Sequence, residues 1–203
     1  MKTAALIPAK SFGRAKSRLA ATLSPEERRL FAKRCFLGVA RAAIESAAFE
    51  RVFVATDGSE VEALAQAEGL GVILDPPTPL PFHAILDRAL GVLAHQGFER
   101  ATVLMADLPE ADAASIRAAA DENAELILVP DASGMGTSAL TLPLPAPFTT
   151  AFGNHDSALR HRALAESSGL RFLIRELPAL ARDVDGPLDL IRNPPLYRAM
   201  VSR

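Results

Sequence analysis

Short apolar runs alternate along the chain with longer segments of helical spacing. The apolar runs end in turn residues and predict β-strands, whereas the segments between them carry apolar residues every three or four positions and predict helices. The predicted strands are Thr3–Pro8, Arg51–Thr56, Gly71–Leu74, Ala101–Met105 and Glu125–Val129. The predicted helices are Pro25–Ile44, Ser59–Glu68, Phe82–Gln96 and Ala111–Asp121, the first with Ser24 as its N-cap. Because successive parallel strands need a helical crossover, this part predicts an open, mostly parallel sheet covered on both faces.

The alternation changes after Val129. Gly134 and Gly136 indicate a tight loop, a strand over Ser138–Leu142 follows, and three prolines within residues 143–147 predict a rigid non-helical connection. Helical spacing returns over residues 156–168, and residues 170–174 form a further strand candidate. We interpret this part as a late β insertion in one domain that spans residues 1–203. The fold class predicted is three-layer α/β/α.

Composition narrows the class of protein. Hydrophobic residues make up 49% of the chain, charged residues 23%, and the net charge is -2, as in soluble globular proteins. The chain lacks the basic excess of a nucleic-acid-coating protein, so no nucleic-acid partner is expected. A single cysteine, Cys35, excludes an intramolecular disulfide and a multi-cysteine metal site. No apolar run is long enough for a secretory signal or a membrane span, so we expect no membrane association and a cytoplasmic location. The apolar pattern does not distinguish a monomer from a homo-oligomer.

The loop after the first predicted strand is cationic. Lys10, Arg14, Lys16 and Arg18 occur there together with Gly13. Ligands of parallel sheets bind beyond the carboxyl ends of the strands, and cationic heads with accessible backbone N–H groups suit a polyphosphate. Composition alone fits a solvated basic loop equally well, but the position at a strand end favours phosphate binding. Neither a Walker A sequence nor a GxGxxG turn is present, which argues against a P-loop ATPase and a dinucleotide-binding turn.

Three carboxylates also lie where strands or turns end. Asp107 follows the fourth predicted strand, and Asp183 and Asp185 precede Gly186. Asp107 alone could cap the next helix, and the later pair could lie in a surface turn. Taken with the cationic loop, however, these acids provide the oxygen ligands that Mg²⁺-assisted nucleotidyl transfer requires.

Two later segments offer donors to an anion. The loop over residues 133–137 combines glycines with the hydroxyl group of Thr137. A helix begins near Asp156 or Ser157, and its N-terminus, with Ser157 and His161 one turn on, suits a phosphate, although an ordinary N-cap explains either residue equally well. Cys35 lies among apolar residues and is interpreted as a core residue.

Five motifs in order resemble one family. They are Ile-Pro-Ala-Lys with Ala-Lys-Ser-Arg-Leu, then Ala-Asp-Leu-Pro, Gly-Thr-Ser-Ala-Leu, Phe-Gly with Ser and His, and Asp-Val-Asp-Gly-Pro-Leu-Asp-Leu. Together they resemble the phospholactate guanylyltransferase (CofC/FbiD) family of deazaflavin coenzyme biosynthesis over nearly the whole chain. The resemblance implies a nucleotide-diphospho-sugar-transferase-like fold, similar to molybdenum-cofactor guanylyltransferases. It also implies transfer of GMP from GTP to a phosphorylated three-carbon acid with release of pyrophosphate. The residues leave open whether that acid is 2-phospho-L-lactate, phosphoenolpyruvate or 3-phosphoglycerate.

The resemblance implies a role for each motif. The residues implied to hold the GTP phosphates are Lys10, Gly13, Lys16 and Arg18. Those implied to bind Mg²⁺ are Asp107, Asp183 and Asp185, and those implied to bind the acceptor are Thr137, Gly153 and Ser157. Lys16 and Asp107 are the catalytic candidates among them.

The chain departs from the family pattern at two places. At the first place, Asp156 occupies the position where the family has its serine, and Ser157 falls one residue later; we favour a one-residue insertion as the reason. At the second, Asp87 stands where the family has an asparagine on the nucleobase side. Two other functions remain open on the residues alone. One is nucleotidyl transfer to a sugar phosphate or a molybdopterin-like acceptor, and the other is nucleotide binding without catalysis.

Overall fold

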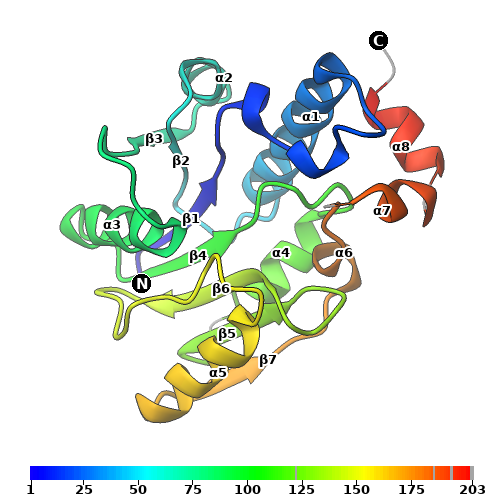
Figure 1. The fold of residues 1–203 in the computed structure, drawn as a ribbon. Coiled ribbons are helices and arrows are strands. Elements are labelled where there is room, and N and C mark those ends of the chain that lie inside the picture. Colours follow the sequence, from blue (N-terminus) through cyan, green and yellow to red (C-terminus); the bar gives the residue numbers. More distant parts are fainter. Residues whose placement is uncertain (122, 185, 193, 202–203) are drawn as a thin grey trace.

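A seven-stranded sheet forms the centre of the computed structural model, which describes residues 1–121, 123–184, 186–192 and 194–201 (Figure 1). Its strands are β1 (Thr3–Pro8), β2 (Arg51–Thr56), β3 (Gly71–Leu74), β4 (Arg100–Leu104), β5 (Leu126–Pro130), β6 (Thr137–Pro143) and β7 (Phe172–Ile174). Their order across the sheet is β3-β2-β1-β4-β6-β5-β7. Every strand predicted from the sequence is present, with bounds that differ by up to two residues.

The predicted β insertion is a strand of the main sheet. Strands β1 to β4 pair in parallel, and β6 pairs antiparallel with both β4 and β5. Because β6 runs in the opposite direction, its first residues lie at the carboxyl end of β4, where the N–H of Met105 donates to the carbonyl of Ser138 at 3.0 Å. The sheet is therefore mostly parallel, as predicted, with one reversed strand in its middle.

Helices cover both faces of the sheet and complete the three predicted layers (Figure 1). Helices α1 (Pro25–Glu45), α2 (Ser59–Ala67), α4 (Ala113–Ala119) and α6 (Pro178–Ala181) pack on one face. Helices α3 (Phe82–His95) and α5 (Ser157–Ser167) pack on the other. Helix α1 begins as predicted, because the Ser24 hydroxyl accepts from the Glu27 N–H while the Glu27 carboxylate accepts from the Ser24 N–H.

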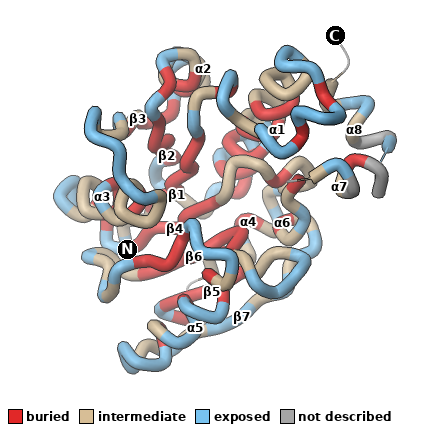
Figure 2. The backbone as a smooth tube through the Cα atoms, in the orientation of Figure 1, coloured by how far each residue is buried: buried red, intermediate tan, exposed pale blue. Residues whose placement is uncertain are grey.

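The C-terminal part adds a smaller cluster beside α1. Helices α7 (Pro187–Arg192) and α8 (Pro194–Val201) follow α6, and α8 packs on α1. Val184 and Leu190 are buried there against Leu19 and Cys35, which confirms the interpretation of Cys35 as a core residue. The buried positions run through the sheet and the inner sides of the helices (Figure 2). Among the described residues, no helix has the length and apolar character that a membrane span requires.

Candidate active site

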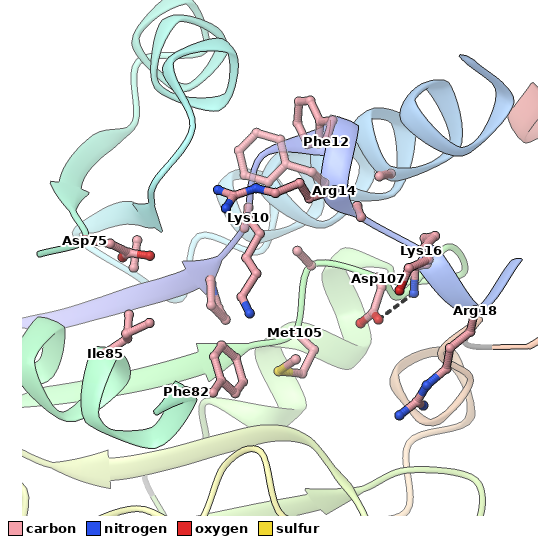
Figure 3. A pocket seen from close by; sticks show the side chains of 18 residues that line it. Lys10, Phe12, Arg14, Lys16, Arg18, Asp75, Phe82, Ile85, Met105 and Asp107 are labelled. Atoms are coloured by element: carbon pink, nitrogen blue, oxygen red, sulfur yellow. Dashed lines mark hydrogen bonds and ion pairs between the residues drawn. The ribbon is translucent and has the colours of Figure 1, made fainter. Parts of the chain in front are cut away.

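A pocket of about 480 Å³ opens at the carboxyl ends of β1 and β4 (Figure 3). Its cationic lining comes from Lys10, Arg14, Lys16 and Arg18, all on the loop after β1. Asp75 and Asp107 supply carboxylates, and Phe82, Ile85 and Met105 supply the apolar wall. Four cationic side chains against two carboxylates give the lining an excess of positive charge, which favours an anionic ligand.

The cationic loop is anchored at its start. The buried ring of Phe12 packs against Phe36 of α1 with 5.9 Å between the ring centroids. The N–H of Ser11 donates to the Asp57 carboxylate at 3.0 Å, and a Cβ atom on Gly58 would lie 2.9 Å from the Ser11 Cα. Since such an approach leaves no room for a side chain at position 58, the loop is held against the end of β2.

Lys16 and Asp107 form an ion pair inside the pocket. The Lys16 ammonium lies 2.7 Å from the Asp107 carboxylate, with 7% of the lysine side chain and 25% of the aspartate side chain exposed (Figure 3). Lys16 has φ +55° in the left-handed region, which is unfavourable for a residue other than glycine. Asp107 does not cap the following helix, because the N-cap of α4 is Asp112, whose carboxylate accepts from the Ser115 N–H at 2.7 Å.

The other residues of the loop differ in position. The Lys10 ammonium lies 5.9 Å from the centroid of the Phe82 ring, within the pocket. Arg14 forms an ion pair with Asp57 at the loop's edge. Gly13 is absent from the pocket lining, and a Cβ atom there would meet no atom within 4 Å. The loop therefore brings Lys10, Lys16 and Arg18 to the cavity but places Gly13 beside it.

The two later acidic positions follow α6. Asp183 is half-buried, and its neighbour Val184 packs against Leu19 and Cys35, which brings this segment to the cationic loop. Burial raises the pKa of the Cys35 thiol to about 12, and the charges of Lys16 and Asp107 also act on it. Asp185 lies outside the described residues. Among those that are described, no three His, Cys, Asp or Glu side chains gather into a cluster that could hold a metal ion.

The residues assigned to the acceptor lie on β6, on the loop before α5 and at the start of α5. The Ser157 hydroxyl donates to Thr137 Oγ1 at 3.1 Å, and both residues are buried. Asp156 instead forms an ion pair with Arg160 on the surface at 2.7 Å. Of the two candidates at the start of α5, the structure therefore brings Ser157 to Thr137 and turns Asp156 away.

His161 lies behind these hydroxyl groups, in the interior of the protein. Its side chain is fully buried, with Nδ1 3.0 Å from Thr137 Oγ1 and Nε2 accepting from the Ala151 N–H at 2.8 Å. Burial lowers the pKa of His161 to about 4. The expectation that His161 faces a phosphate is wrong, because both of its ring nitrogens are occupied and no part of the ring is exposed.

Gly153 connects the acceptor residues to the cationic pocket. It has φ +89°, and a Cβ atom there would lie 3.2 Å from the Cβ of Phe82, which lines the pocket. The Phe152 ring packs edge-on against the rings of Phe82 and His161. Asp87 of α3 accepts from the Thr150 N–H at 3.0 Å, so its carboxylate holds this loop in place.

A second hollow of about 750 Å³ adjoins the first, and sequence reasoning did not identify it. Residues 74–80 and 56–59 line it, and it shares Lys10, Arg14, Asp75 and Ile85 with the cationic pocket. Burial, with the neighbouring Asp57 charge, raises the pKa of Asp75. The signal was available in the sequence, because Asp75 directly follows β3, and Asp107 comes shortly after β4.

Sequence comparison identifies the family. The family model described as "Guanylyl transferase CofC like" matches residues 3–192. The chain belongs to this guanylyltransferase family. A phosphoenolpyruvate guanylyltransferase of Conexibacter woesei is 35% identical, covering 94% of this chain and 86% of the relative. A 2-phospho-L-lactate guanylyltransferase of Halorubrum lacusprofundi is 36% identical (87% and 77% covered), and a 3-phospho-D-glycerate guanylyltransferase of Phenylobacterium zucineum is 34% identical (87% and 83%).

Structure comparison agrees with the family at the level of the fold. A nucleotide-diphospho-sugar transferase-like protein of Desulfovibrio desulfuricans superposes with a TM-score of 0.77 at 13% identity, covering 98% of this chain and 99% of that one. A nucleotidyl transferase of Methanothermobacter thermautotrophicus gives 0.67 at 17% identity, with 98% of both chains covered. The predicted nucleotidyltransferase fold is confirmed.

Proposed function

We propose that the protein transfers GMP from GTP to a phosphorylated three-carbon acid and releases pyrophosphate, as the resemblance to the deazaflavin coenzyme enzymes implies. The observation that carries the proposal is the pocket at the carboxyl ends of β1 and β4, where four cations surround a cavity and Lys16 is already paired with Asp107. The three relatives described above are all named as guanylyltransferases of such acids. Family membership therefore favours a phosphoacid over a sugar phosphate or a molybdopterin-like acceptor.

GTP would occupy both hollows. Its phosphates would lie against Lys10, Lys16 and Arg18, where cationic heads offset the charge of the triphosphate. Its nucleoside would enter the second hollow, which shares Lys10 and Asp75 with the first. The Asp75 carboxylate there is an acceptor suited to the N–H groups on the edge of guanine, which adenine does not present in the same pattern.

Carboxylates near the cationic loop are the candidates to hold a divalent cation. Asp107 is partly exposed and lines the pocket, and Asp183 precedes Val184, which packs in one cluster with Leu19 just after the cationic loop. Carboxylate oxygens are the ligands that Mg²⁺ prefers, and we assign Asp107, Asp183 and Asp185 to this ion. When bound, Mg²⁺ neutralises phosphate charge during transfer. A structure of similar fold, the Rv0371c protein of Mycobacterium tuberculosis at 19% identity and a TM-score of 0.52, was solved as a manganese complex, with 95% of this chain and 97% of that chain covered.

The acceptor phosphate would lie against Thr137, Gly153 and Ser157. One of its oxygens is already anionic and attacks the α-phosphorus of GTP. The bond between the α-phosphorus and the oxygen that bridges it to the β-phosphorus breaks, and pyrophosphate leaves with that oxygen. A strong general base is unnecessary for this nucleophile. The protein's task is to offset repulsion between two anions and to hold them in line, and we assign these roles to the lysines and to the Thr137 hydroxyl group.

The test is a direct assay of transfer. Purified protein is incubated with Mg²⁺, GTP and each of phosphoenolpyruvate, 2-phospho-L-lactate and 3-phospho-D-glycerate, and pyrophosphate and the guanylylated product are measured. We expect acceptor-dependent turnover with at least one acid, reduced when ATP replaces GTP. Lys33→Ala on α1, outside the pocket, should retain this turnover, whereas Lys16→Ala should lose most of it. Absence of product with all three acids would contradict the proposal.

A further inference from the structure

A buried chain of hydrogen bonds links the loop before α5 to the start of β6. The Ala151 N–H donates to His161 Nε2 at 2.8 Å, and His161 Nδ1 lies 3.0 Å from Thr137 Oγ1. The Ser157 hydroxyl donates to the same Thr137 oxygen at 3.1 Å. All three side chains are buried, with His161 at 0% exposure. The direction of each hydrogen bond in this chain can be worked out from the chemistry of its members.

The backbone fixes where the imidazole carries its proton. A backbone N–H can only donate, so the Nε2 atom that faces Ala151 must carry no proton. Burial lowers the pKa of His161 to about 4, so the ring is neutral at pH 7 and holds its one proton on Nδ1. Nδ1–H therefore donates to Thr137 Oγ1.

The consequence falls on the Thr137 hydroxyl group. Its oxygen accepts from His161 and from Ser157, which uses both of its lone pairs. Its own proton has no acceptor among the hydrogen bonds of the described residues. The hydroxyl group is left as a donor only, with no lone pair to offer a ligand.

We propose that His161 is a positioning residue that makes Thr137 a one-way hydrogen-bond donor to an ionised oxygen of the acceptor. The proposal rests on the proposed function, in which Thr137 faces the acceptor's phosphate or carboxylate. Ionised oxygens only accept hydrogen bonds, so a hydroxyl group that can only donate matches them. The same arrangement disfavours neutral hydroxyl or amide groups, because their protons would face an oxygen that has no free lone pair. His161 itself touches no substrate.

The first experiment reads the tautomer without any turnover. Long-range ¹H–¹⁵N correlation spectra of the protein labelled at its four histidines separate the Nδ1–H, Nε2–H and doubly protonated forms. The signals that vanish in His161→Asn belong to His161. We expect the Nδ1–H form at pH 7. The Nε2–H form or the cation at that pH would overturn the proposal, whether or not the protein is a guanylyltransferase.

The second experiment measures kcat/KM for the phosphoacid that supports the highest turnover, together with the Kd of GTP alone by calorimetry. We expect His161→Leu to lower kcat/KM for the acid about tenfold, as the loss of one oriented hydrogen bond to a charged group does, while the Kd of GTP stays within twofold. His161→Asn, which keeps an N–H near the Nδ1 position, should retain more of the acceptor's kcat/KM than His161→Leu. His95→Asn, on the exposed end of α3, is the matched control and should match the parent.

A double-mutant cycle separates positioning from a structural role. In the Thr137→Val background no hydroxyl group remains to be oriented, so adding His161→Asn should lower kcat/KM for the acid no further. An equal loss in both backgrounds, or an unchanged acceptor kcat/KM in His161→Leu, would overturn the proposal while leaving the proposed function intact. Failure of the parent to use any phosphoacid would count against the proposed function instead.

Discussion

Lys16 is subject to two opposing effects that substitutions can separate. Its backbone has φ +55°, and the left-handed region costs a residue other than glycine about 1–2 kcal/mol. Its ammonium group donates to Asp107 at 2.7 Å, and a hydrogen bond between charged groups contributes about 1.5–3 kcal/mol. With 7% and 25% of the two side chains exposed, solvent screens this pair only in part.

Two substitutions at this position should therefore differ in stability. Lys16→Ala loses the ion pair and keeps the unfavourable backbone, so we expect the free energy of unfolding to fall by about 2 kcal/mol. Lys16→Gly loses the same pair but removes the backbone penalty, so it should be more stable than Lys16→Ala by about 1 kcal/mol. Urea unfolding at pH 7, followed by circular dichroism, measures both variants and the Lys33→Ala control.

Activity should not follow stability in these two variants. Both lack the ammonium group, so both should lose kcat/KM for GTP by about the same factor, roughly tenfold to a hundredfold. If Lys16→Gly proved less stable than Lys16→Ala, the backbone at this position would not be strained as argued. If both variants kept the parent's kcat/KM for GTP, Lys16 would have no contact with the nucleotide.

Three further predictions concern other parts of the site. Asp107→Asn and Asp183→Asn should each reduce Mg²⁺-dependent turnover by about tenfold to a hundredfold, with the fold retained. If turnover depended on the Mg²⁺ concentration in both variants as it does in the parent, the metal assignment would be rejected. Gly153→Ala should lower the free energy of unfolding by about 1–2 kcal/mol, because position 153 has φ +89° and a Cβ atom would crowd Phe82. Thermal unfolding measures this change, and an unchanged melting temperature would show that the loop relaxes around the new side chain. Burial lowers the pKa of His161 from 6.5 to about 4, so the unfolded state binds a proton on this residue at a higher pH than the folded state does. The parent should therefore lose about 3 kcal/mol of stability between pH 6.5 and pH 4 that His161→Asn does not lose. Urea midpoints that change in parallel for the two proteins over this range would contradict the prediction.

The sequence predicts the local elements well because their determinants are local. The capping residues Ser24 and Glu27 and the apolar runs of the parallel strands depend on neighbours a few positions away. The predicted start of α4 at Ala111 is two residues early, because Asp112 caps the helix through Ser115. The sequence pattern did not predict the short helices α7 and α8. The packing of α8 on α1 depends on residues more than 150 positions distant, as the hydrogen bond from Arg34 to the Ala199 carbonyl illustrates.

The site follows the same division between local and distant determinants. A carboxylate after a strand predicts that Asp107 lies at the carboxyl edge of the sheet, but nothing local predicts that Lys16, 91 residues away, pairs with it. Likewise, the hydroxyl group of Thr137 was a visible candidate donor, whereas its bond to His161, 24 residues on, required the fold. Residue type indicates which groups can act, and tertiary contacts decide which of them remain available to a ligand.

The reversed strand β6 explains how one edge of the sheet is lined by residues that follow some strands and precede another. In a parallel strand the residues that reach this edge come after the strand, as Lys10 and Asp107 do. Because β6 is antiparallel to β4, the residues that reach the edge come before or at its start, as Thr137 does. The pocket that we propose for the nucleotide is thus lined by loops after parallel strands, whereas Thr137, which we propose for the acceptor, lies where the chain enters the reversed strand. One antiparallel strand next to β4 therefore brings Thr137 to the same edge of the sheet as Lys10 and Asp107, while β1 to β4 keep their parallel pairing.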